Sequence, residues 1–172
     1  GDRAEAVAVD SNGDVYVVGT TEGDLGDQKI DPVAKDMFLQ KYDAAGNLLF
    51  TRRLGAPFDG SAFSVKVDAN DNVFVSGQVH GLLDADGHGG NYDTFVSKYD
   101  KNGIEIFTRQ LAPFADDANV VNTVPASSGS NTLYLVDATG SGGPQDIVLM
   151  FDTTQNITTS NITTLATPYI SG

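Results

Sequence analysis

Short apolar runs separated by polar turns fill the chain, and they occur in matched sets. Residues 6–19 (AVAVDSNGDVYVVG) recur as residues 64–77 (SVKVDANDNVFVSG), and residues 36–54 (DMFLQKYDAAGNLLFTRRL) recur as residues 93–111 (DTFVSKYDKNGIEIFTRQL). The runs are rich in Val, Phe, Tyr and Ile, and Asn, Asp and Gly separate them, as in strands joined by tight hairpins. No stretch has a helical period. The pattern therefore predicts an all-β chain built from tandem units.

Each unit contains four such runs, which predict a four-stranded antiparallel meander. The first run of the first unit is small and apolar throughout (residues 6–9, AVAV), which is typical of a strand buried on both faces. The last run alternates apolar residues with Thr51, Arg52 and Arg53, so we expect one face in solvent and the arginines at a soluble rim. A β-propeller blade has this gradient, because its first strand lines the central channel.

A third, eroded copy follows the first two. Residues 146–157 (DIVLMFDTTQNI) align with residues 93–104, and the blades are predicted at residues 1–58, 59–114 and 115–172. In the third blade the strands are expected at residues 119–124, 132–137 and 146–151, with the fourth inside residues 156–165. A closed propeller needs about four to eight blades. We therefore expect a partial propeller, either a fragment of a longer protein or an arc that closes by self-association.

The repeated pattern resembles a known family. The elements A-x-A-V-D-x-x-G-x-V-Y-V-x-G, then D-x-F and K-Y-D-x-x-G, then a strand ending in T-R-x-L, are similar to the bacterial seven-bladed β-propeller (SBBP-type) repeat and, more loosely, to NHL-type blades. The resemblance implies an extracytoplasmic bacterial propeller module and no particular activity. Such repeats also occur in flagellin-like and other surface-filament proteins.

Composition narrows the classes of partner. The 172 residues carry a formal net charge of −13, so nucleic acid and anionic membrane surfaces are poor partners. The chain has no cysteine, which excludes disulfides and thiolate metal sites and is compatible with secretion. No apolar run approaches the roughly 20 residues of a membrane span, so no membrane insertion is expected. We expect an extracellular or cell-surface location.

The two connections after the second strands break the repeat and are the best places to look for function. Residues 20–35 (TTEGDLGDQKIDPVAK) and residues 78–92 (QVHGLLDADGHGGNY) are near the upper length of ordinary loops and do not resemble each other. In a blade both lie on the same face of the propeller. The residues predicted to form a partner-binding face there are Asp24, Asp27, Asp31, His80 and Tyr92.

One loop motif suggests a metal. Asp84, Asp86 and His88 lie in the sequence DADGHG, where two carboxylates one residue apart and a glycine that permits a sharp turn are candidates to bind calcium. A solvated acidic loop explains the same residues without an ion. His80 and His88 with the two aspartates are an alternative zinc set, although a glycine-rich loop preorganises it poorly.

Other recurring carboxylates have simpler explanations. Asp10-x-Asn12-x-Asp14 and its copy at residues 68–72 resemble the start of a calcium loop, but no bidentate Glu follows at the twelfth position. Both lie where a hairpin is required, which favours Asx turns. Asp36 recurs at residues 93 and 146 at the start of the third strand. We expect these three carboxylates to accept backbone N–H groups, with a ring of carboxylates for catalysis or metal as the alternative.

No catalytic constellation stands out. Ser61, Ser64 and Ser76 lie on or beside strands without a nucleophile-elbow motif. We therefore expect a non-enzymatic extracellular module, structural or adhesive, of a bacterial surface or filament-associated protein, which binds a protein or glycan through its long acidic loops. Two alternatives stay open. One is a calcium- or carbohydrate-binding lectin-like domain, for which Tyr92 is the one suitable loop aromatic, and the other is a fragment of a propeller enzyme such as a glycan lyase or hydrolase.

Overall fold

The computed structural model describes residues 1–23, 25, 35–54, 60–80, 92–111, 120–125, 132–137, 147–152 and 163–166. From residue 120 onward, and at residues 92–94, 109 and 111, the description covers the backbone alone. These residues form no helix, so none of them provides a helix that could cross a membrane.

Twelve described strands form three antiparallel sheets of four strands each, in sequence order within each sheet. The first sheet consists of β1 (Arg3–Val9), β2 (Val15–Thr21), β3 (Asp36–Tyr42) and β4 (Leu48–Leu54). The second consists of β5 (Gly60–Val67), β6 (Val73–His80), β7 (Tyr92–Tyr99) and β8 (Glu105–Leu111). The third consists of β9 (Val120–Pro125), β10 (Thr132–Asp137), β11 (Ile147–Asp152) and β12 (Thr163–Ala166). The all-β prediction and the four-stranded meanders are confirmed.

The strands of the eroded third unit lie close to their predicted positions. β10 has the predicted bounds, while β9 and β11 each begin one residue later than expected. The fourth strand was the least certain from the pattern, and β12 overlaps only the end of the interval 156–165. The blade boundaries predicted at residues 58/59 and 114/115 lie outside the described residues.

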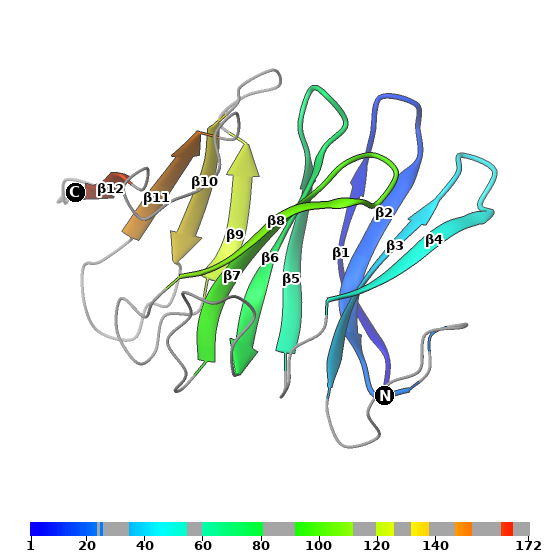
Figure 1. The fold of residues 1–172 in the computed structure, drawn as a ribbon, viewed down its shortest axis with the longest axis horizontal. Helices are drawn as coiled ribbons and strands as arrows, with labels where there is room; N and C mark the ends of the chain where they lie inside the picture. The colour runs from blue at the N-terminus through cyan, green and yellow to red at the C-terminus, as the bar shows by residue number, and fades with distance from the viewer. Residues whose placement is uncertain are drawn as a thin grey trace, which may run out of the picture.

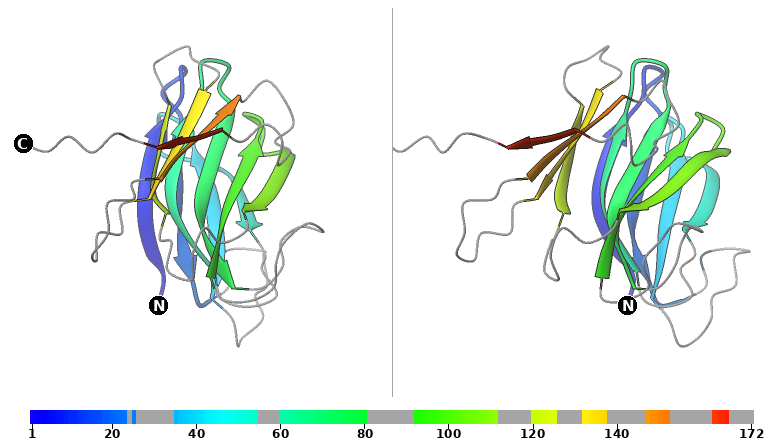
Figure 2. Two further views of the ribbon diagram at one scale, coloured as in Figure 1. Left: turned by 90° about the vertical axis from the view of Figure 1, so that its left-hand side faces the viewer. Right: turned by 60° about the vertical axis from the view of Figure 1, so that its left-hand side comes forward.

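The sheets are arranged like consecutive propeller blades. Figure 1 shows them side by side, and Figure 2 gives the same arrangement from two other directions. The first strands of successive sheets are neighbours, because β5 contacts β1 on one side and β9 on the other. The three described sheets form an open arc and do not close into a ring.

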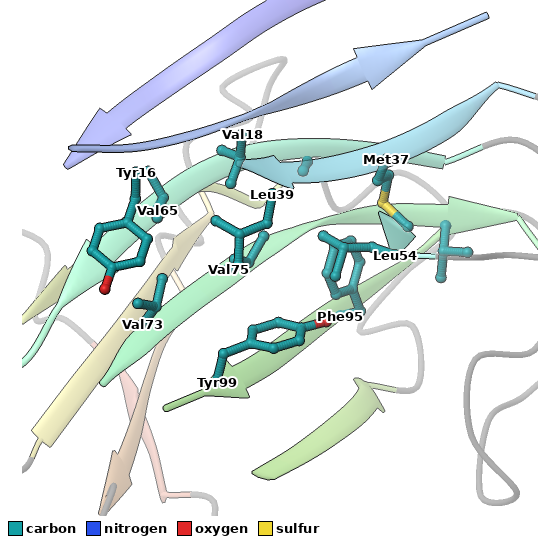
Figure 3. Close-up of a cluster of buried hydrophobic side chains, with 12 residues drawn as sticks. Tyr16, Val18, Met37, Leu39, Leu54, Val65, Val73, Val75, Phe95 and Tyr99 are labelled. Carbon is teal, nitrogen blue, oxygen red and sulfur yellow. The ribbon is translucent and has the colours of Figure 1, made fainter. Parts of the chain in front are cut away.

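The core of the described residues lies between the first and second sheets. Tyr16, Val18 and Leu39 of the first sheet pack against Val75 and Phe95 of the second, as Figure 3 shows. All five side chains have no solvent exposure. Burial of apolar area at this scale is the main favourable term in stacking one sheet on the next.

The prediction that the first strand is buried on both faces is wrong for β1. Val7 and Val9 are 62% and 58% exposed. Val65, which occupies the position of Val7 in the second unit, is 1% exposed because the first sheet packs against it. Both units have valine at this position, and the difference arises because no sheet in the described part of the chain covers this side of β1.

A β-bulge explains one repeated glycine of the motif. The register of β1 with β2 shifts between Ala4 and Ala6, and Gly19 pairs with Ala4 at the shift. Gly77 lies at the equivalent shift of β5 with β6. A Cβ atom on either glycine would lie 1.9 Å from a carbonyl oxygen of the neighbouring strand, so no larger residue fits unless the strand moves.

Replacing Gly77 with alanine is expected to lower the free energy of unfolding by about 3 kcal/mol, because the added methyl group meets rigid backbone in a packed sheet. Urea unfolding monitored by circular dichroism measures this loss. Gly1→Ala, where a Cβ meets nothing within 4 Å, is the control. An unchanged urea midpoint for Gly77→Ala would contradict the close approach at the bulge.

Candidate functional site

The largest group of buried charges in the described residues surrounds Lys41. Its ammonium Nζ lies 3.0 Å from Asp10 Oδ2 and 3.0 Å from Asp14 Oδ2. It also donates to the backbone carbonyl of Lys101 at 3.2 Å, which lies in the β7–β8 turn of the second sheet. The Lys41 side chain is only 7% exposed. This lysine therefore joins the two sheets through a turn.

An Asx turn positions the Asp10 carboxylate for this contact. Asp10 Oδ1 accepts the backbone N–H groups of Asn12 at 3.0 Å and Asp14 at 2.9 Å, which leaves Oδ2 directed toward Lys41. Asp68 makes the same turn with the backbone of Asn70 and Asn72. The Asx-turn interpretation of both motifs is confirmed.

Tyr16 completes the group around Lys41. Its hydroxyl donates to Asp10 Oδ2 at 3.3 Å, and its ring lies 4.8 Å from Lys41 Nζ, within the range of a cation–π contact. Neither Tyr16 nor Lys41 is among the functional residues predicted from the sequence. The available signal was a lysine that recurs, as Lys41 and Lys98, inside an otherwise apolar third strand.

The environment holds Lys41 and Asp10 in their charged forms. Burial alone would lower the pKa of Lys41, but hydrogen bonds with Tyr16, Asp14 and Asp10 outweigh it and raise the pKa above its ordinary value. Burial likewise opposes the charge of Asp10, yet Lys41 and the turn N–H groups lower its pKa. Burial raises the pKa of Tyr16. A lysine held charged in this way is unsuited to act as a nucleophile or general base.

A second contact between the sheets uses Arg52. Its Nε donates to the carbonyl of Gly103 at 2.7 Å, and Nη2 donates to the carbonyl of Asn102 at 3.3 Å. Its guanidinium lies 4.7 Å from the centre of the Phe50 ring. Arg52 was expected at a soluble rim, and this was wrong, because the neighbouring blade brings a turn to it that the pattern of one blade does not reveal.

Arg53 also departs from the expected rim role. It forms an ion pair with Asp36, whose carboxylate is buried. The expectation for Asp36 named only backbone N–H partners, and this ion pair within the first sheet was not anticipated. The side chains of Asp93 and Asp146, its equivalents in the other units, lie outside the described residues.

Most of the predicted loop residues lie outside the described residues. This applies to Asp24, Asp27, Asp31, Asp84, Asp86 and His88. The calcium and zinc hypotheses for the second loop therefore stay predictions. Within the described residues, no group of three or more His, Asp or Glu side chains is placed to hold a metal ion.

Two loop-face residues are placed by the strands. His80 ends β6 and is directly paired with Tyr92, which begins β7. His80 is partly buried. The structure thus brings together two members of the predicted partner-binding face at the base of the second loop, on neighbouring strands.

Lys41→Met is expected to lower the free energy of unfolding by about 3–5 kcal/mol, because it leaves the buried Asp10 carboxylate and the partly exposed Asp14 carboxylate without their cation. Urea unfolding measures the loss. Lys35→Met removes the exposed Lys35–Glu22 pair and is expected to leave the urea midpoint nearly unchanged. Equal effects of the two substitutions would contradict the structural role of Lys41.

The cost of Lys41→Met is expected to depend on pH. The folded pKa of Asp10 lies below its usual 3.8, so its contribution is present above that pH and is lost as the pH falls through the folded pKa. The folded pKa of Lys41 lies above its usual 10.5, so its contribution is complete below 10.5 and is lost as the pH rises through the folded pKa. The stability difference between wild type and variant should be constant from about pH 5 to 9 and should shrink below about pH 4. A difference that persists unchanged at lower pH would argue against the ion pair.

A matched pair of glycines tests the docked turn. Gly103 and Gly46 occupy equivalent turns with φ of 76° and 89°, so alanine costs about 1 kcal/mol of backbone strain at each. At Gly103 the new Cβ would also lie 2.8 Å from the Phe50 ring, whereas at Gly46 it would meet nothing. Gly103→Ala should therefore lose about 1–3 kcal/mol more than Gly46→Ala. Phe50→Leu should reduce the extra loss, and identical unfolding midpoints would rule out the contact.

Comparison with known proteins agrees with this architecture. Residues 2–26, which include β1 and β2, match the family model described as Beta-propeller repeat (SBBP). A stretch of 108 residues is 31% identical to the Regulatory protein FlaEY of Caulobacter vibrioides, covering 58% of this chain and 11% of that protein. The chain thus corresponds to a small part of this relative's length. The chain thus carries an SBBP-type β-propeller repeat match over the first two strands of the first blade, and the same sequence pattern recurs in the second four-stranded sheet.

Proposed function

We propose that the chain is a non-catalytic structural module of a β-propeller protein at the bacterial cell surface, and that it binds a protein or glycan partner there. The observation that carries this proposal is that the buried charged side chains form structural contacts between and within blades. Asp10, Asp14 and Lys41 are the most densely paired ionisable side chains in the described residues, and Lys41 also joins the first blade to the second through the Lys101 carbonyl. Their chemistry supports stacking of blades rather than turnover of a substrate.

The relative supports a modular role. The Regulatory protein FlaEY is named for regulation, and this chain aligns with 11% of it. A β-propeller repeat that makes up a small part of a long protein is suited to hold a binding surface in place. We extend to this chain a role in binding partners and no reaction.

The contrast between sheets and loops supports a binding role for the loops. The strand sequences of the first two units match closely, while residues 20–35 and 78–92 share no pattern and are acidic. Selection for a common scaffold with different contacts produces this distribution. A partner with a cationic or hydrogen-bond donor surface fits the negative charge. The paired strand ends at His80 and Tyr92 would support the second loop in such a contact.

The location can be tested in the bacterium that encodes the chain, because these 172 residues contain no cysteine and an introduced thiol is unique among them. Ile104 is 63% exposed, so Ile104→Cys offers an accessible thiol. A membrane-impermeant maleimide is expected to label this variant on intact cells. Val65→Cys, at a position only 1% exposed, should be labelled only after denaturation and serves as the control. Labelling of Ile104→Cys that requires cell lysis would overturn the proposed location.

A further inference from the structure

The first sheet has an uncovered apolar face. Val7 pairs with Val17 and Val9 pairs with Val15 across β1 and β2, so the four valines lie on one side of the sheet. Val7 and Val9 are 62% and 58% exposed, and Val15 and Val17 are partly exposed. We call these four residues the outer valine face. The opposite side of the same two strands carries Tyr16 and Val18 into the core.

The second unit shows which kind of surface packs against the equivalent valines. Val65, Val73 and Val75 occupy the positions of Val7, Val15 and Val17, and they are 1%, 0% and 0% exposed. They are buried because the opposite side of the first sheet, which carries Val18 and Leu39, packs on them. We call this side of a sheet its inner side. The same positions of the same repeat thus bind a four-stranded sheet in one unit and are open in the other.

The turn beside each face repeats this contrast. In the second unit the carbonyls of Lys101 and Gly103 accept hydrogen bonds from Lys41 and Arg52 of the first sheet, and Gly103 is buried. The equivalent turn of the first unit is formed by Ala44, Ala45 and Gly46, and all three residues are exposed. In the described part of the chain, no side chain donates to the carbonyls of Ala44 or Gly46. As far as the described residues go, these two carbonyls therefore present the acceptors of the docked turn without the lysine and arginine donors.

We propose that the outer valine face and the Ala44–Gly46 turn together bind a further four-stranded blade of the same repeat. This blade carries a lysine in its third strand that donates to the Ala44 carbonyl and an arginine in its fourth strand that donates to the Gly46 carbonyl. Its inner side supplies apolar residues equivalent to Val18 and Leu39, which cover Val7 and Val17. The inference concerns stacking alone and does not depend on the cellular location proposed above.

A second copy of the chain does not meet this description. In a second copy, the inner side of the first sheet is occupied by the second sheet, and the second sheet in turn contacts β9 of the third. Of the described sheets, the third alone is not followed by another. Residues 115–172 contain no lysine or arginine, so this sheet cannot supply either donor. Charge complementarity thus favours a blade that resembles the first two units over self-association.

The test adds such a blade to the full chain. Residues 1–58 are duplicated directly ahead of Gly1, which keeps the natural spacing between units, and Val7→Cys is placed in the original copy only. In the unextended chain this thiol should react with maleimide at the rate of an exposed site. In the extended chain it should react at least roughly tenfold more slowly, because the added blade must detach before the reagent can enter. Ile104→Cys should react equally fast in both proteins and is the control.

Further variants separate the possible outcomes. Lys41→Met and Arg52→Met in the added blade remove the two donors and should restore most of the fast labelling. Fast labelling in the extended chain, with circular dichroism showing that the added blade is folded, would overturn the proposal. Protection of Val7→Cys in the unextended chain that increases with protein concentration would also overturn it, because a second copy would then occupy the face.

Discussion

A four-stranded blade of this repeat has apolar side chains on both of its faces. Both faces are removed from water only when the blade is stacked between two others. The second sheet shows the completed arrangement. Val65 and Val75 are buried on the side toward the first sheet, and Phe74 and Val96 are buried on the side toward the third. The first sheet shares only one of these two interfaces, so its outer valines stay exposed. The stability of each blade therefore depends on its neighbours, as in other repeat architectures.

The buried polar contacts determine how one blade sits on the next. Apolar faces of similar shape can slide, whereas Lys41 and Arg52 reach particular carbonyls in a turn of the adjacent blade. Removing these cations from water is costly, and Asp10 and Asp14 offset that cost because an Asx turn already orients the Asp10 carboxylate. We infer that this group contributes more to the specific registration of the two blades than to their net stability.

The sequence predicted the features that are encoded within one unit. The strands, the meander order and the Asx turns follow from local alternation and turn chemistry, and Asp10 and Asp68 were placed correctly for that reason. The errors concern contacts between units. The exposure of Val7 arises because no described sheet covers β1 on that side, and the role of Arg52 depends on a turn about fifty positions away. The sequence pattern of one unit contains no information on which neighbouring sheet or turn these residues contact. The loop carboxylates fall outside the described residues, so their assignment depends on the sequence alone.

The contacts between blades give the stack a direction. At the interface between the first and second sheets, the first sheet supplies the donors Lys41 and Arg52, and the second sheet supplies the acceptor carbonyls of Lys101 and Gly103. An interface of this kind is heterologous, so it continues until a rotation closes a ring. The two ends of the described arc differ in consequence. The first sheet presents valines and acceptor carbonyls, whereas the third unit has no basic residue with which to repeat the donors. Extension at the first sheet by a donor-bearing blade is thus chemically matched, while head-to-tail growth of identical chains is not.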